Sequence, residues 1–323
     1  MDTRRAGTWE GLVTLPLRLG TAPLRLAGPL LEPVLEPVRS STARSVRRAV
    51  GVPEAGPGRR RPGGRAGGRE ALFLPPDAVA RRVHGDLPSM MIGGLAALLL
   101  QILHPQTMAG VADHSRYAVD PLGRLRRTAS FVGTTTFGTV PEAEAAIGRV
   151  RSVHARVTGR APDGQPYRAD DPELLTWVHA AETASFLAAC RRYGAARLGP
   201  GDADRYLQET AEVAMRLGAE WVPRSEEELE AYLLSMRPQL YAGAQAREAR
   251  DFLLRGVSRR PEQQAVYACI AAAAVGLLPG WARRKIGLPS PPLVDSMLDW
   301  AVVRPAAWGL CQGLRWAVGP GPG

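Results

Sequence analysis

The chain has 323 residues, 45% apolar and 22% charged, which suits one large globular domain or two small ones. Its net charge of +10 is unevenly placed, because residues 1–69 hold 13 Arg and five Asp or Glu, a net +8. The remaining body is nearly neutral and lacks a basic stripe interleaved with aromatic residues, so we expect no specific nucleic-acid partner.

The first 69 residues form a compositionally separate segment. Five prolines between residues 11 and 38 exclude one long helix there, and residues 51–69 are of low complexity, rich in Gly, Arg and Pro. We predict a disordered basic segment over residues 1–69 and one helical domain over residues 70–318. The basic segment is either a solvated tail or a contact with an anionic membrane surface.

Helical patterns dominate the rest of the chain, and no alternating pattern is long enough for a large sheet. The predicted fold class is therefore all-α. The predicted helices cover residues 75–83, 90–103, 121–131, 141–158, 171–193, 202–218, 225–234, 239–255, 261–278 and 290–316. Pro105 places a helix boundary at His104. A short loop with a tight turn at Gly110 is predicted between His104 and His114, and a second turn at Asp163-Gly164.

The three cysteines, Cys190, Cys269 and Cys311, are widely spaced, and no CxxC pair occurs. A zinc site built from thiolates or a disulfide framework is therefore not expected. The first 20 residues lack a continuous apolar core, so we predict no secretory signal. The most apolar runs, residues 90–103 and 265–278, fall short of the roughly 20 residues that span a bilayer. We expect a cytoplasmic protein, with peripheral membrane contact as an option.

All five histidines lie between residues 84 and 179. His154 shares a predicted helical face with Val150, Val153 and Val157, and a neutral imidazole on an apolar face is what a haem iron needs. The alternative is a core histidine that is bonded to a carbonyl. His179, near Leu175, Val178 and Glu182, has the same two interpretations.

Two further groups of residues are candidates for a site. Arg124, Arg127 and Thr128 share a helical face, so they could clamp carboxylates such as haem propionates, or polarise bound oxygen. A basic surface face is the alternative. His104 and His114 flank the predicted short loop and could border a pocket. They are too far apart for a helical metal pair, and no HExxH, GxSxG or phosphate-loop motif is present.

Five segments occur in a distinctive order. They are HPQTMAGVADHS (104–115), DPLGRLRRT (120–128), FGT (137–139), VRSVHARVTG (150–159) and YRADDPELLTWVHA (167–180). Together they resemble the MpaB/rubber-oxygenase catalytic domain, the family of latex-clearing proteins. The resemblance extends over residues 70–310, with less specific matching after residue 200.

The resemblance implies a globin-like, all-helical fold that binds haem b. It also implies that His154 is the proximal iron ligand, with His179 as the alternative ligand or a pocket residue. The distal cluster falls on Arg124, Arg127 and Thr128. Arg127 stands where latex-clearing relatives have lysine. Because arginine stays protonated, we do not expect this side chain to cap the iron.

The function that the resemblance implies is oxygenation or oxidative cleavage of an apolar isoprenoid or lipid substrate, with haem iron and molecular oxygen. Intracellular lipid is favoured over extracellular rubber, because no secretion signal is evident. The alternative is a non-enzymatic helical protein that binds lipid or a membrane surface through its basic N-terminal segment. The two can coexist, with the basic segment localising an oxygenase to lipid.

Overall fold

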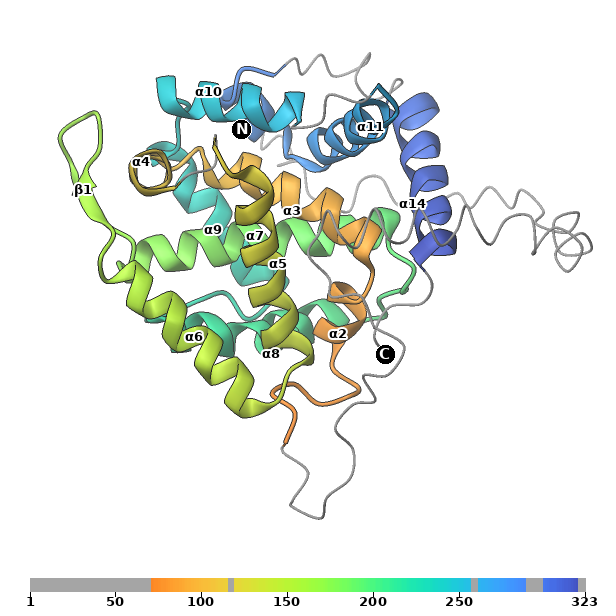
Figure 1. Ribbon diagram of the computed structural model, residues 1–323, viewed down its shortest axis with the longest axis horizontal. Helices are drawn as coiled ribbons and strands as arrows, with labels where there is room; N and C mark the ends of the chain where they lie inside the picture. Colours follow the sequence, from red (N-terminus) through yellow and green to blue (C-terminus); the bar gives the residue numbers. More distant parts are fainter. Residues whose placement is uncertain (1–70, 116–118, 257–260, 289–298, 319–323) are drawn as a thin grey trace, which may run out of the picture.

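The computed structural model describes residues 71–115, 119–256, 261–288 and 299–318, and these residues are mostly helical (Figure 1). Within these ranges one two-stranded sheet is present. The prediction of an all-α fold is thereby confirmed, whereas its likeness to globins remains a prediction. The predicted disordered segment, residues 1–69, and residues 290–298 of the last predicted helix lie outside the described ranges.

The elements follow one another along the chain with short connections. The first half contains α2 (Val79–His84), α3 (Leu87–Gln101), α4 (Pro105–His114), α5 (Pro121–Phe137), α6 (Val140–His154), β1 (Thr158–Arg160), β2 (Pro166–Arg168) and α7 (Pro172–Tyr193). The second half contains α8 (Asp202–Leu217), α9 (Glu226–Met236), the 3-10 turn η2 (Arg237–Gln239), α10 (Ala244–Arg255), α11 (Pro261–Leu277), α12 (Gly280–Lys285), the π-helical η3 (Asp299–Val303) and α14 (Arg304–Val318).

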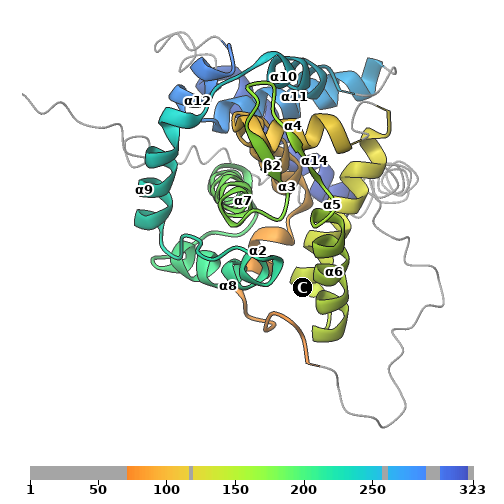
Figure 2. The ribbon, with the colours of Figure 1, turned by 90° about the vertical axis from the view of Figure 1, so that its left-hand side faces the viewer.

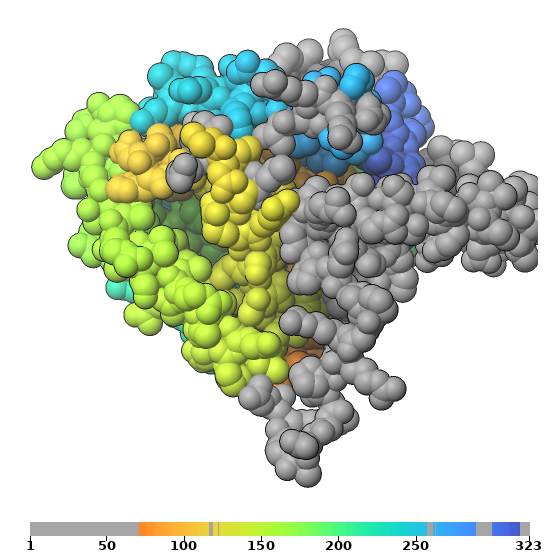
Figure 3. Space-filling view, in the orientation of Figure 1, coloured from red at the N-terminus to blue at the C-terminus, as the bar shows by residue number. Residues whose placement is uncertain are grey.

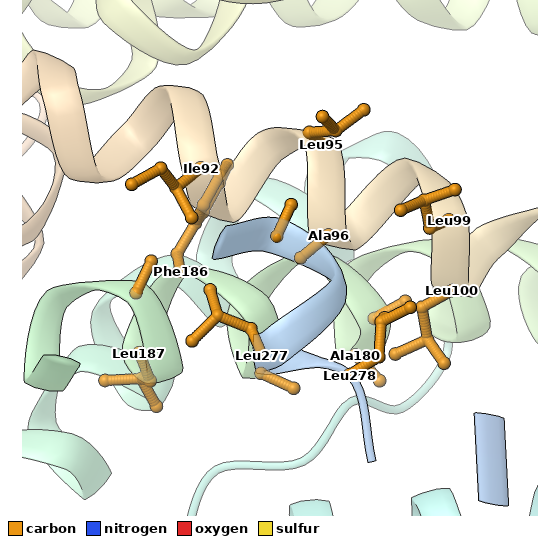
Figure 4. Packing of buried hydrophobic residues seen from close by; sticks show 14 of the residues in the cluster. Ile92, Leu95, Ala96, Leu99, Leu100, Ala180, Phe186, Leu187, Leu277 and Leu278 are labelled. Carbon is orange, nitrogen blue, oxygen red and sulfur yellow. The ribbon is translucent and has the colours of Figure 1, made fainter. Parts of the chain in front are cut away.

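Helices α3 and α7 pack together at the centre of the molecule (Figure 2). Both have buried residues on most sides, as expected for helices enclosed by others. Their backbones approach closely at Gly93, where an added Cβ would lie 2.9 Å from the ring of Phe186. Leu277 and Leu278, at the end of α11, pack on the same core (Figure 4). This core fixes α7, from which several candidate residues project.

Helix α2 is joined to two other helices through polar contacts. The ring of His84 bonds through Nδ1 to Thr136 Oγ1 at 2.8 Å, and through Nε2 to Tyr206 Oη at 2.9 Å. Glu209 accepts from the backbone N–H groups of Val79 and Ala80, at 3.2 and 2.8 Å. These bonds tie α2 to α5 and α8, and the Glu209 carboxylate lies where the helix dipole is positive.

The predicted loop between His104 and His114 is wrong, because residues Pro105–His114 form α4. His104 is the N-cap, as Pro105 indicated, and Met108 N donates to its carbonyl at 2.9 Å. Gly110 is helical and makes no tight turn. A proline in the first turn begins a helix readily, since its missing N–H has no intrahelical partner there.

The predicted helix over residues 141–158 ends earlier, at His154, and its last predicted residue begins β1. Strands β1 and β2 pair antiparallel across the turn predicted at Asp163-Gly164, where Gly164 has a φ of +85°. Tyr167 anchors this hairpin, because its side chain is buried and its hydroxyl donates to Asp113 of α4 at 2.6 Å. The hairpin therefore depends on a contact with α4.

Other boundaries moved by a few residues. Helix α5 continues to Phe137, six residues beyond the predicted end, and the predicted helix over residues 239–255 begins at Ala244 after η2. Helix α12 was not predicted.

In the described part of the chain no single helix has the length and apolarity to cross a membrane. Helices α3 and α4 meet that test only together, and they bend by 107° where they join.

Candidate functional site

A hollow opens between α4, α5 and α6, with green atoms of the α7 region behind it (Figure 3). Helix α5 packs against α6 and α2, yet no described side chain from Gly123 to Thr134 is buried. A Cβ added at Gly133 would meet no atom within 4 Å. On α7, Val178 and Glu182 lie one turn apart and remain partly accessible, although their sequence neighbours are buried. Helices α5 and α7 thus both carry side chains that are partly accessible.

His154 is the last residue of α6 and lies on that helix's inward face. Ala143, Ile147, Val150 and His154 recur at helical spacing, with the first two buried and the last two half-buried. The Nδ1 atom of His154 is buried and has no hydrogen-bond partner among the described residues. Burial lowers the pKa of His154, while the charge of Asp170 opposes that effect. The ring is therefore neutral at physiological pH, the form that binds metals.

The apolar face predicted for His154 was only partly right. Val150 does share the face of His154, but Val153 is 50% exposed. Val157 follows the helix end and packs with the hairpin anchor Tyr167. The inward face follows Ala143 and Ile147, because α8 covers that side of α6.

His179 and Glu182 occupy successive turns of α7. The Nε2 atom of His179 is buried without a described partner, and burial lowers the pKa of His179 to about 4. Burial raises the pKa of Glu182 to about 7, so its carboxyl group exchanges a proton near neutrality. Sequence reasoning named Glu182 only as a neighbour of His179. The signal that could have identified it is an acidic residue on the face shared by Leu175 and Val178.

His104 and His114 lie in different surroundings. His104 is buried, its ring is 6.1 Å from that of Trp177, and its Nδ1 has no partner in the described part of the chain. Burial lowers the pKa of His104 to about 4, against the charge of Asp171. His114 is exposed at the hairpin, where its Nε2 lies 3.1 Å from the carbonyl of Thr158. The structure thus places one of this pair inside and the other on the surface.

The predicted arginine cluster of Arg124, Arg127 and Thr128 lies in the first half of α5, where no described side chain is buried. Arg124 is partly buried and donates to the hydroxyl of Ser115. Arg127 is 67% exposed and lies 3.4 Å from Asp120, the N-cap of α5. Thr128 is exposed. Both guanidiniums are thus held by residues that precede the helix, and of the two Arg124 is nearer the interior.

The fifth histidine, His84, has a structural role. Both of its ring nitrogens are hydrogen-bonded to hydroxyl groups, and burial lowers its pKa to about 3. Over the described ranges, no group of three or more His, Cys, Asp or Glu residues is arranged to hold a metal ion. The ring nitrogens of His104, His154 and His179 are among the buried side-chain atoms that lack a hydrogen-bond partner within the described residues.

Comparison with known families connects this arrangement to an enzyme class. Residues 81–315 match the family described as ER-bound oxygenase mpaB/B′/rubber oxygenase, catalytic domain. No curated protein and no solved structure matches the chain. The matched range covers well over half of the chain and includes every candidate residue named above, which confirms the resemblance seen in the ordered motifs. The protein therefore belongs to the family of mpaB/B′ and rubber oxygenase catalytic domains.

Proposed function

We propose that this protein is a haem b-dependent oxygenase that uses molecular oxygen on an apolar substrate, an isoprenoid or another unsaturated lipid. Family membership supports an oxygenase. The observation that carries the haem assignment is His154, a neutral imidazole on an inward helical face with a buried, unpartnered nitrogen. Buried polar atoms are nearly always hydrogen-bonded, so such a nitrogen suggests a ligand that the protein alone does not supply.

The donor set fits this cofactor. Haem iron already has four porphyrin nitrogens, so a single protein imidazole is enough to hold it, and no cluster of protein ligands is needed. His154 is our choice for that ligand. His179 is the alternative, because it has the same neutral ring and unpartnered nitrogen. His104, which is buried, would be a further cofactor-binding residue. His114 is the least suited of the four histidines to bind the cofactor, because it is exposed.

Bound haem would supply the iron at which oxygen is activated. The chain's own residues would then bind and orient the cofactor and the substrate, and would exclude water from the site. Arg124, partly buried, would pair with a propionate carboxylate. Arg127 and Thr128 would present a positive charge and a hydroxyl to bound oxygen; arginine cannot ligate iron as lysine can. Glu182, whose pKa is about 7, would accept or release a proton inside the site.

The substrate proposal rests on the character of the inward surfaces. Val150 of α6 and Val178 of α7 are half-buried apolar residues close in sequence to the candidate histidines. An apolar wall favours an apolar substrate, because burying a charged one without partners is costly. The proposal covers oxygenation and oxidative cleavage alike.

The experiment is the absorption spectrum of the purified full chain after reconstitution with haem, oxidised and reduced. We expect a Soret band near ~400 nm, the general signature of protein-bound haem. His154→Ala should lose or shift this band, while His114→Ala, at an exposed histidine, should leave it unchanged. A spectrum lost in His179→Ala and kept in His154→Ala would move the ligand to α7. Absence of a Soret band in the wild-type chain would reject haem dependence.

A further inference from the structure

The last described segment of the chain, η3 and α14, exposes its tryptophans. Trp300 of η3 is 61% exposed, and Trp308 and Trp316 of α14 are 53% and 45% exposed. On α14 the two rings share one helical face, with the exposed Gln312 between them. Helix α14 lies at the edge of the molecule beside α11 (Figure 1). Single exposed apolar residues are ordinary, but large aromatic rings that gather in one short segment form a patch.

The charged side chains of the same segment are paired and mostly covered. They are Asp299, Arg304 and Arg315, and they are 17%, 27% and 17% exposed. Arg304 Nε donates to Asp299 at 2.8 Å, and Asp299 also lies 3.8 Å from Arg192 of α7. Arg315 donates to both carboxylate oxygens of Asp86 on α3. The helix therefore has its charges on the side of the fold and its tryptophans on the side of the solvent.

The outward face of η3 and α14 is consequently uncharged over the described residues. Its exposed members other than the tryptophans are Ala301, Val302, Pro305, Ala306, Gly309, Gln312 and Gly313. The neighbouring helix α11, which packs against both η3 and α14, has no charged residue from Gln263 to Leu277. Surface helices normally present charged and polar residues to water, so an uncharged outward face with several tryptophans indicates a contact with a partner.

The chemistry of this face favours a lipid bilayer over a second copy of the chain. An indole ring has an apolar body and one N–H donor, which suits the boundary between lipid tails and water. An interface between two proteins has a polar rim, and for such a rim the described face offers the side chain of Gln312 alone. A bilayer needs no rim. The charge of the chain selects anionic lipid, because residues 1–69 carry a net +8.

We propose that the outward face of η3 and α14 docks on the surface of a bilayer that contains anionic phospholipid. Trp300, Trp308 and Trp316 enter the headgroup boundary, and the basic segment, residues 1–69, attracts the protein to the negative surface. The strength of such docking rises with the apolar area buried and with the electrostatic attraction. Arg304 and Arg315 keep their ion pairs, because both are held on the opposite side of the helix.

The test is flotation of the full chain with vesicles of mixed phosphatidylcholine and phosphatidylglycerol. We expect the wild-type chain to float, and Trp308→Ala combined with Trp316→Ala to lower the partition coefficient about tenfold or more. Trp221→Ala is the matched control and should bind as the wild type does. Trp221 is 49% exposed and stacks on Tyr232 of α9, which Figures 1 and 2 both place away from α14.

Gln312 provides a second test in which the tryptophans are kept. Because its side chain is exposed, a charge at this position should leave the fold intact. Gln312→Glu should weaken binding to the mixed vesicles, whereas Gln312→Lys should strengthen it. Added salt should weaken binding of the wild-type chain, since it screens the attraction of the basic segment.

Three results would overturn the proposed docking. They are a wild-type chain that does not float, equal flotation of the wild type and the double tryptophan variant, and equal flotation of the two Gln312 variants. A wild-type dimer in sedimentation that the double variant converts to a monomer, with no vesicle binding, would assign the face to a second copy. Haem enters none of these measurements, so each result leaves the proposed function as it stands.

Discussion

Asp86, the N-cap of α3, and Arg315, near the end of α14, form a two-contact ion pair at 2.8 and 2.6 Å. The two residues are 229 positions apart, and their side chains are 8% and 17% exposed, respectively. Arg315 also donates to the carbonyl of Tyr193, at the end of α7. One guanidinium therefore holds the C-terminal helix against both central helices.

Arg315→Met should lower the free energy of unfolding by about 3–5 kcal/mol, because it leaves the carboxylate of Asp86 buried and unpaired. Denaturant unfolding followed by circular dichroism measures this loss. Asp86→Asn combined with Arg315→Met should recover part of it, since no buried charge then remains. A loss under 1 kcal/mol in the single variant would show that α14 is not held by this pair.

Two glycines that face Tyr167 should respond oppositely to alanine. At Gly159 in β1 an added Cβ would lie 2.5 Å from the Tyr167 hydroxyl, so Gly159→Ala should cost about 1–3 kcal/mol by forcing the anchor aside. At Gly110 in α4 the nearest atom of the same ring would be at 3.5 Å, an ordinary contact. Gly110→Ala should be neutral or stabilise by up to about 1 kcal/mol. Thermal unfolding of both variants tests the pair; equal effects would contradict the hairpin packing.

Arg127→Ala should leave the free energy of unfolding nearly unchanged and lower the turnover rate. Its ion pair with Asp120 is exposed and 3.4 Å long, so its loss should change the free energy of unfolding by less than about 0.5 kcal/mol. If Arg127 acts on bound oxygen, turnover should fall tenfold or more in the same variant. Arg149→Ala, at another exposed arginine on α6, is the control and should retain turnover. Full activity in Arg127→Ala would remove it from the catalytic group.

Acid should destabilise the fold through three histidines whose pKa values are lowered in the folded protein. Burial lowers the pKa of His84 to about 3, and the pKa values of His104 and His179 to about 4. The unfolded chain binds these protons near pH 6.5, so the stability is present above that value and is lost as pH falls towards 4. The loss for each histidine, between neutral pH and pH ~4, is on the order of 3 kcal/mol. Unfolding free energies from pH 7 to 4.5 test the slope, and His84→Gln should flatten it.

Glu182 should have the opposite dependence. Its pKa is raised by burial to about 7 from 4.5, so the folded state keeps the proton longer than the unfolded chain does. The stability linked to this group is complete below pH ~4.5 and falls as pH rises through 7. Glu182→Gln should therefore stabilise the protein without haem by up to about 3 kcal/mol at pH 8, and change little at pH 4. Equal effects at both pH values would show that Glu182 is solvated.

Local sequence determined much of the helical framework. Asp171, Pro172 and Glu173 form a complete start signal, and the helix that begins there ends at Tyr193 as predicted. Capping and helical periodicity act over a few residues, so they can be read without knowing the fold. The ordered motifs between residues 104 and 180 likewise indicated the family before any packing was known, because each is a short linear pattern.

Tertiary structure decided where those elements end, and which side chains acquire a shifted pKa or a buried atom without a partner. Helix α6 ends at His154 because the next residues pair with β2, whose Tyr167 is anchored on α4. The burial of Glu182 and of the His154 ring likewise depends on segments brought together by folding. Desolvation, ladder pairing and ion pairs act through space between residues distant in sequence. Periodicity could therefore name His154 as a candidate, but only the packed fold gave it a buried nitrogen without a partner.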